Sequence, residues 1–415
     1  MLSKKKLAAA LFISSMSGLT FAESVAITNA NLYTGATPAV LEGATIVFED
    51  GKISAINPDT LNADTVIDGT GKIVTPGLIG SINALGLVEV GAVADTRDSG
   101  TEKGSITFNP SLAFNPESTL LPLARKGGVT SDIIVSSAES NDFAGAATLV
   151  STSSSLDFTT TEVAVITYLH GEEKGSRASK IQELDDALSK QQEKLTKKDD
   201  KEGDKAKSPS ESEKKLTAML EGKLPLIVAT ERPADILQML ALKAKYNLKL
   251  IIAGASGAVA VTDKLVEADV PVIISATHDL PESFDELYAA LDNASVLASK
   301  GVKIAITVAG DSSHNLHQLR FEAGNAVAHG LDYQTAIRAI TSNLADFFAL
   351  ESKGSLEVGK DADLVVWSGD PLEFSSRVES IWIAGEQQST ITRQDKLRDR
   401  YLNTQQSDLP PGYRK

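Results

Sequence analysis

Short apolar strands alternate with amphipathic helices through the middle of the chain, and this alternation constrains the fold most strongly. β-branched runs predict seven strands, at 77–83, 129–137, 162–169, 224–230, 248–254, 270–275 and 302–310. Apolar residues at helical spacing predict helices at 234–246 and 332–350, the second capped by Asp332. Continuous apolar strands separated by helices are typical of a parallel sheet with a helical cover.

One further weak strand would close these strands into an eight-stranded (β/α)8 barrel. An open, doubly wound sheet is the alternative architecture. The glycine-containing stretch AGASGA at 253–258 fits no complete phosphate-binding fingerprint, so the barrel is favoured.

Both ends of the chain are β-rich. Residues 44–56 form two alternating runs joined at Asp50-Gly51, a strong hairpin signal, and residues 354–371 and 378–387 repeat the pattern. Between the ends, 189–214 is a charged stretch nearly free of apolar residues, for which we expect a solvated insertion that is helical in part at best.

Composition limits the function. The chain has 415 residues, 42% of them hydrophobic, which suits one large α/β domain and a small one. A formal charge of −15 argues against nucleic acid, because phosphate binding needs a basic face. The absence of cysteine excludes disulfides and thiolate ligands. There are five histidines: His170, His278, His314, His317 and His329.

The first 22 residues have the pattern of a signal peptide. Lys4, Lys5 and Lys6 precede the apolar core LAAALFISSM, and Thr20-Phe21-Ala22 places small residues where signal peptidase acts. The apolar run is shorter than the ~20 residues that a membrane span requires. We therefore expect cleavage after Ala22 and a periplasmic protein with no membrane span after processing.

The segment GSLEVGKDADLVVWSGDP at 354–371 is similar to the C-terminal signature of the amidohydrolase superfamily, in its imidazolonepropionase-like periplasmic branch. KIVTPGLI at 72–79, the strand 5–7 region at 224–274 and the helical region at 330–350 resemble that family in the same order. The resemblance implies a (β/α)8 TIM-like barrel at 75–353. It also implies a composite β-sandwich from 23–74 and 354–390, followed by a tail at 391–415.

In that family a metal at the barrel mouth is held by two strand-1 histidines, one histidine each from strands 5 and 6, and a strand-8 aspartate. Some branches add a carboxylated lysine. The metal lowers the pKa of bound water toward ~7. The corresponding positions here carry Ile82, Ala84, Ala229 or Thr230, Gly254 and Asp311. Because catalytic zinc normally needs three protein ligands, we expect no cofactor, with Asp311 left as the catalytic proton carrier.

Histidines near Asp311 offer the one route to a rebuilt centre. His314 and His317 would share a helical face just after Asp311, so a divalent metal such as zinc is expected only if they rebuild a site around that aspartate. Three ligands from one short segment would make a poor cage. His170 and His329 are interpreted as surface or packing residues.

Polar residues at strand ends are the substrate-binding candidates. Loop 85–100 brings Glu89 and Arg97, and 230–235 brings Glu231 and Arg232. An arginine fork suits carboxylate recognition. With His278 after strand 7 and His314, the predicted substrate-binding set is Glu89, Arg97, Arg232, His278 and His314. Each could instead be a surface, capping or loop residue.

Two functions follow from the resemblance. One is hydrolysis of a non-peptide C–N bond in a cyclic amide or small amide. The alternative is a catalytically silent relative that binds a small ligand or a partner subunit without metal. The sequence leaves homo- and hetero-oligomers open. A carbohydrate-binding scaffold has little support, because Trp367 and Trp382 are the only tryptophans and both fall in predicted sandwich strands.

The signal-peptide pattern gives a first prediction. N-terminal sequencing of the exported protein should start at Glu23, because Ala22 is the residue before the expected cleavage site. Retention of Lys4–Lys6 in the mature form would contradict it.

Overall fold

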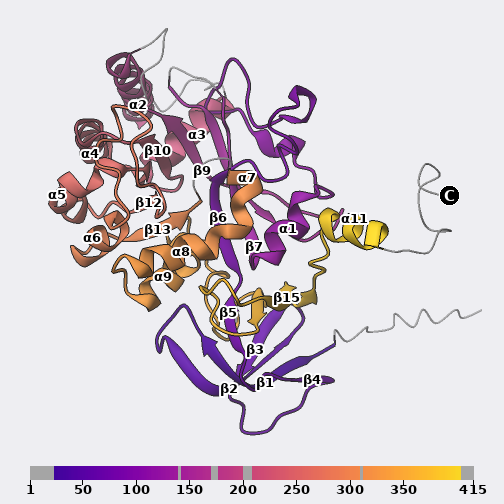
Figure 1. The fold of residues 1–415 in the computed structure, drawn as a ribbon. Coiled ribbons are helices and arrows are strands. Elements are labelled where there is room, and N and C mark those ends of the chain that lie inside the picture. The colour runs from indigo at the N-terminus through magenta and orange to yellow at the C-terminus, as the bar shows by residue number, and fades with distance from the viewer. Residues whose placement is uncertain (1–22, 139–141, 170–175, 200–207, 309–311, 403–415) are drawn as a thin grey trace, which may run out of the picture.

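The computed structural model describes residues 23–138, 142–169, 176–199, 208–308 and 312–402 (Figure 1). The chain forms two eight-stranded sheets. One sheet curls into a nearly closed barrel, and the other forms a sandwich, so the predicted fold class is confirmed. The predicted signal peptide, Asp311 and His170 lie outside the described residues.

The barrel strands pair in chain order. They are β6 (Leu78–Asn83), β7 (Val129–Val135), β8 (Gly145–Ser151), β9 (Thr161–Tyr168), β10 (Leu226–Thr230), β11 (Leu250–Gly254), β12 (Val272–Ser275) and β13 (Ile304–Thr307). Across the closure, Thr307 Oγ1 on β13 donates a hydrogen bond to the Ser81 carbonyl on β6 at 2.6 Å. All seven predicted strands are present, and the unassigned eighth strand is β8.

The prediction of a wholly parallel barrel is wrong at β8, which pairs antiparallel with both β7 and β9. Its connections, 136–144 and 152–160, are too short for the crossover that parallel neighbours need. In place of a crossover helix, an earlier part of the chain contacts this strand. There, Ala146 N–H donates to the Phe108 carbonyl at 2.8 Å.

Most helices follow the alternation of the barrel. They are α1 (Leu120–Lys126), α2 (Arg177–Asp199), α3 (Glu211–Leu220), α4 (Pro233–Tyr246), α5 (Thr262–Glu267), α6 (Asn293–Ser299), α7 (Ser312–Asn315), α8 (Leu319–Ala328), α9 (Tyr333–Ala339), α10 (Ser342–Phe347) and α11 (Arg393–Leu402). No helix in the described part of the chain has both the length and the apolar composition that a bilayer crossing requires.

The helix predicted at 234–246 is confirmed as α4, whereas the one predicted at 332–350 is divided into α9 and α10. Asp332 caps α9 as expected, accepting a hydrogen bond from Thr335 N–H at 2.9 Å. The break falls at Thr341, whose backbone (φ −139°, ψ −98°) is not helical and whose hydroxyl donates to the Ile337 carbonyl at 2.6 Å.

The charged stretch 189–214 is more helical than predicted. Its described residues continue α2 to Asp199 and begin α3, which starts with a capping box between Ser210 and Glu213. The two helices are joined by a hydrogen bond from Gln191 Nε2 to Thr217 Oγ1 at 2.9 Å and by a Lys194–Glu213 ion pair at 3.0 Å. Polar contacts between the helices, rather than a wide apolar stripe, therefore stabilise this excursion.

The second sheet is built from both ends of the chain, in the order β16-β15-β14-β5-β1-β2-β3, with β4 paired to β1. Its strands are β1 (Val25–Tyr33), β2 (Val40–Glu49), β3 (Lys52–Ile56), β4 (Thr65–Asp68), β5 (Ile73–Pro76), β14 (Leu364–Trp367), β15 (Val378–Ile383) and β16 (Glu386–Gln387). The ends meet where β5 pairs antiparallel with β14, which confirms the composite sandwich. Because β5 leads directly into β6, the C-terminal mouth of the barrel faces away from the sandwich (Figure 1).

A buried lysine explains the two acids of the GKDADLVV motif. Lys353 Nζ lies 2.6 Å from Asp363 Oδ2 and 3.0 Å from Asp361 Oδ2, and Asp361 is also paired with Lys52 at 2.6 Å. Burial alone would lower the pKa of Lys353, but the two carboxylates raise it above its usual value. Asp363 Oδ1 also accepts a hydrogen bond from Ala384 N–H, so this ion-pair network connects the turn at Lys353 to three sandwich segments.

Removing the Lys353 ammonium should destabilise the protein. We expect Lys353→Met to lower the free energy of unfolding by about 3–5 kcal/mol, because it leaves the buried Asp363 carboxylate without its counter-charge. The more exposed Lys52→Met is the matched control and should cost about 1 kcal/mol or less. Equal urea midpoints for the two variants would contradict the assigned role of Lys353.

Candidate functional site

The barrel interior is filled with apolar side chains. One buried cluster contains Ile79, Ile133, Ala164, Ile166, Ile227, Ile251, Ile273 and Ala305, together with Leu344 and Phe348 from the region of α10. A filled interior leaves the C-terminal mouth as the place for chemistry, since the ends of the parallel strands meet there.

Strand 1 of the barrel supplies no ligand to this mouth. Ile82 packs against the interior cluster, whereas Ala84 packs against the outer core. The cause is local backbone geometry, because Ile82 has a positive φ of 57°, which is unusual for a β-branched residue and redirects the chain. Ala84 N–H then donates to Ser313 Oγ on α7 at 3.2 Å.

The strand-6 position is occupied by another residue's side chain. Gly254 has φ +80°, and a Cβ added there would lie 2.0 Å from Glu231 Oε1. The Glu231 carboxylate therefore takes the space into which a strand-6 side chain would project. Its Oε2 accepts a hydrogen bond from Ser256 N–H at 2.8 Å. Burial raises the pKa of Glu231, although the hydrogen bonds with Ser256 oppose this shift.

His278 lies at the same mouth, just after β12. Its Nε2 is 3.1 Å from Glu286 Oε2, and both side chains are partly exposed. Burial alone would raise the pKa of Glu286, but hydrogen bonds from Glu282 N–H, Ser283 and His278 hold it below its usual value. Glu286 and His278 both influence the titration of Glu231, so these three groups are electrostatically coupled.

Arg232 is already engaged by protein carboxylates. Its Nε lies 3.5 Å from Asp235 Oδ2, three residues along α4. Asp235 also contacts Arg177 Nε at 3.3 Å, and Arg177 contacts Asp285. The Arg177 contacts hold the loop after β12 against the start of α4, whereas Arg232 adds only its local contact with Asp235.

Glu89 and His314 lie on either side of the chain that follows β6. Glu89 Oε2 accepts a hydrogen bond from Thr119 Oγ1 at 2.9 Å. His314 lies on α7, and its carbonyl accepts a hydrogen bond from His317 Nδ1 at 3.0 Å. Burial lowers the pKa of His317 below its usual value, which favours the neutral ring.

Of the metal-ligand positions that the family resemblance implies, Asp311 lies outside the described residues, and the remaining positions lie in or beside β6, β10 and β11. The positions described in β6, β10 and β11 offer alkyl, hydroxyl or glycine groups rather than imidazoles. Within the described ranges, no three His, Asp or Glu side chains gather as a metal site. We derive no metal-dependent step from this geometry.

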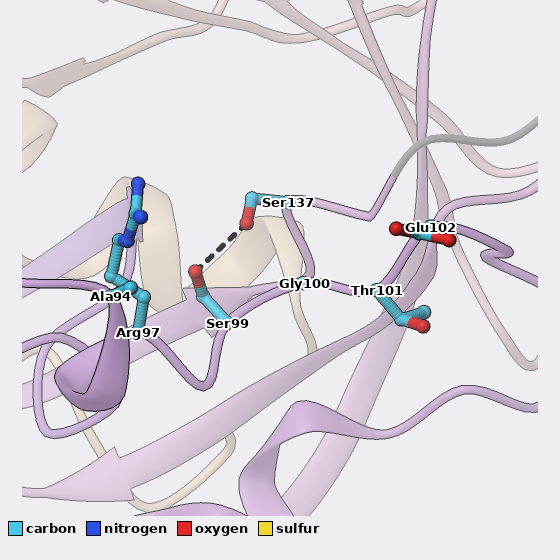
Figure 2. A pocket seen from close by; sticks show the side chains of 7 residues that line it. All are labelled: Ala94, Arg97, Ser99, Gly100, Thr101, Glu102 and Ser137. Carbon is cyan, nitrogen blue, oxygen red and sulfur yellow. Dashed lines mark hydrogen bonds between the residues drawn. The ribbon is translucent and has the colours of Figure 1, made fainter.

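Arg97 lines a polar cleft of about 990 Å³ beside the end of β7 (Figure 2). The lining residues are Ala94, Arg97, Ser99, Gly100, Thr101, Glu102 and Ser137. Figure 2 shows the Ser99–Ser137 hydroxyl pair, 2.8 Å apart, between Arg97 and Glu102. Arg97 forms no ion pair with any residue that the structure describes, so its guanidinium is available to a ligand.

Asp132 is a fully buried carboxyl group in the middle of the barrel strand β7. Its Oδ1 accepts a hydrogen bond from Asn83 Nδ2 at 2.7 Å, and its Oδ2 has no hydrogen-bond partner among the residues that the structure describes. Burial raises the pKa of Asp132 to about 7. Gly80 lies against it, since a Cβ there would be 2.4 Å from Oδ1. Sequence patterning did not single out this group, because Asp132 follows two other polar residues of β7, Thr130 and Ser131.

Comparisons with known proteins agree with this architecture. The model of the "Amidohydrolase family" matches residues 257–394. The solved structure of an amidohydrolase from Thermotoga maritima MSB8 is similar over 88% of this chain and 99% of that chain, with a TM-score of 0.79 and 23% identity. An adenosine deaminase from Xanthomonas campestris, solved with bound zinc, has a TM-score of 0.54 and 17% identity over 90% and 95% of the two chains.

Among curated proteins, Amidohydrolase tasK of Hapsidospora irregularis is 33% identical over 75 residues. That alignment spans 18% of this chain and 8% of the relative. The family-model match is confined to residues 257–394, and the solved structures share the barrel-plus-sandwich fold, so the chain is similar to amidohydrolases in both respects.

The buried Asp132 gives a pH-dependent prediction. Its folded-state pKa lies above the value of about 3.9 in an unfolded chain, so its contribution to stability is full below pH ~4 and is lost as the pH rises to about 7. Asp132→Asn cannot ionise, so it should melt at a higher temperature than the parent at pH 8, with a smaller difference at pH 5. The exposed Asp59→Asn is the control. A pH-independent difference for Asp132→Asn would contradict the assignment.

Proposed function

We propose that the protein hydrolyses a non-peptide C–N bond in a small amide or cyclic amide that carries a carboxylate. Similarity to the amidohydrolase family supports the reaction class. Arg97 supports a carboxylate-bearing substrate. It lines a small-molecule-sized cleft and has no ion-pair partner among the described residues.

Recognition in this cleft would combine charge with hydroxyl groups. The planar Arg97 guanidinium suits two parallel hydrogen bonds to a carboxylate. Ser99, Thr101 and Ser137 supply hydroxyls that can donate to an amide carbonyl or accept from an amide N–H. Glu102 would repel a second negative charge on the ligand, so a monoanion fits better than a dianion.

The filled ligand positions favour a second candidate. Because Ile82 packs inward and Glu231 covers Gly254, the protein would instead be a catalytically silent relative that binds the same small molecule, or a partner subunit, without turnover. In either case we propose that the mature protein acts in the periplasm, on the basis of the signal-peptide pattern at 1–22.

Substrate turnover and binding distinguish the two candidates. Purified protein, treated with chelator, would be assayed with cyclic amides, N-acyl amino acids and dipeptides. Arg97→Gln should raise KM for carboxylate-bearing substrates roughly 10- to 100-fold, the effect of losing a charged hydrogen-bond pair. Neutral analogues should be unaffected.

The exposed Arg377, on the sandwich, provides a matched control as Arg377→Gln, which should behave like the parent. Saturable binding without product would support the silent relative. If the protein neither bound nor hydrolysed any compound of the panel, that result would contradict both small-molecule candidates.

A further inference from the structure

We infer that Glu231, with His278 and Glu286, forms an acid–base centre at the barrel mouth that transfers protons without a metal. The inference rests on the proposed C–N hydrolysis and assigns its proton carriers. None of the three residues occupies a position where the family resemblance places a ligand.

The location of Glu231 suits chemistry. It directly follows β10, at the C-terminal edge where barrel enzymes place catalytic groups. Its carboxylate lies against the exposed Gly254, so it borders the open mouth rather than the core. A side chain at 254 would collide with Glu231 Oε1, so the glycine makes room for the acid.

Backbone groups of β11 and the following turn hold Glu231 in place. Ser256 N–H donates to the carboxylate at 2.8 Å, and Gly257 N–H donates to the Glu231 carbonyl at 2.8 Å. A Cβ at Gly257 would lie 2.4 Å from that carbonyl oxygen. Fixing both the backbone and the side chain restricts the carboxyl group to one position, which a proton carrier requires.

The charges around Glu231 favour proton exchange. Burial and the charge of Glu286 raise the pKa of Glu231, whereas the hydrogen bonds of Ser256 and the charge of His278 lower it. A carboxyl with a raised pKa is protonated more readily near neutral pH, so it can act as base and then as acid in one cycle.

His278 and Glu286 form the second part of the centre. Their 3.1 Å contact orients the imidazole, and Glu286 is itself held by Glu282 N–H at 2.8 Å and Ser283 Oγ at 3.0 Å. Contacts of Arg177 with Asp235 and Asp285 fix the loop that carries Glu286. The imidazole is therefore held in one orientation beside Glu286 at the mouth.

The reaction balances without an oxidant or reductant. The Glu231 carboxylate accepts a proton from water as the water oxygen bonds to the amide carbonyl carbon, whose π electrons move to oxygen. The oxyanion then re-forms the carbonyl, the C–N bond breaks, and Glu231 returns its proton to the leaving nitrogen, giving a carboxylic acid and an amine.

In the alternative, purely structural role, the Glu231 carboxylate only stabilises the turn at 254–257. Glu231→Gln distinguishes these roles, because the amide oxygen can still accept from Ser256 N–H but cannot transfer a proton. We expect kcat in chelator-treated protein to fall roughly 100-fold or more, with little change in KM or melting temperature. Glu286→Gln should shift the pH profile of kcat/KM. Glu282→Gln, on the same loop with an exposed side chain, is the control.

The outcomes separate the inference from the proposed function. Parent-like kcat in Glu231→Gln would overturn the role of Glu231 and leave the hydrolysis standing. Activity that the chelator abolishes and zinc restores would also overturn the metal-free centre. Absence of turnover by the parent protein on the whole panel would overturn the proposed hydrolysis, and the catalytic role with it.

Discussion

Pairing of β5 with β14 is the constraint on which the rest of the structure depends. Residues some 290 positions apart become neighbours there, and Trp367 Nε1 on β14 donates to Thr75 Oγ1 on β5 at 2.9 Å. The Trp367 ring also fills the space beside Gly128, where an added Cβ would lie 2.4 Å from it. This pairing fixes where β6 enters the barrel, and therefore which end of the barrel becomes the open mouth.

At that mouth, small local features replace the family's ligand positions. The positive φ of Ile82 sends its side chain into the interior cluster, and Gly254 leaves space that the Glu231 carboxylate occupies. The result is a mouth lined by a buried acid, a histidine–glutamate pair and, beside β7, a polar cleft containing Arg97. Carboxylate recognition and proton transfer are the two kinds of chemistry that these groups supply.

Much of the fold could be predicted from sequence, because β-branched strands and helical spacing are local signals. The strand β8 could not, since its Gly-Ala-Ala start lacks β-branched residues, and neither could the break at Thr341. For the site, the sequence placed His278 at a strand end, but its contact with Glu286 depends on a loop. The prediction that Arg232 binds substrate was misleading, because the neighbouring Asp235 contacts its guanidinium. The contact between Glu231 and Gly254 joins two strands whose register no single motif encodes.

Anomalous X-ray scattering at the zinc edge, from crystals grown with excess zinc, tests the central claim most directly. We expect no zinc peak among the ends of β6, β10 and β11, and continuous density for the Glu231 carboxylate against Gly254. An ordered zinc ion coordinated at that mouth by side chains of this chain would contradict it.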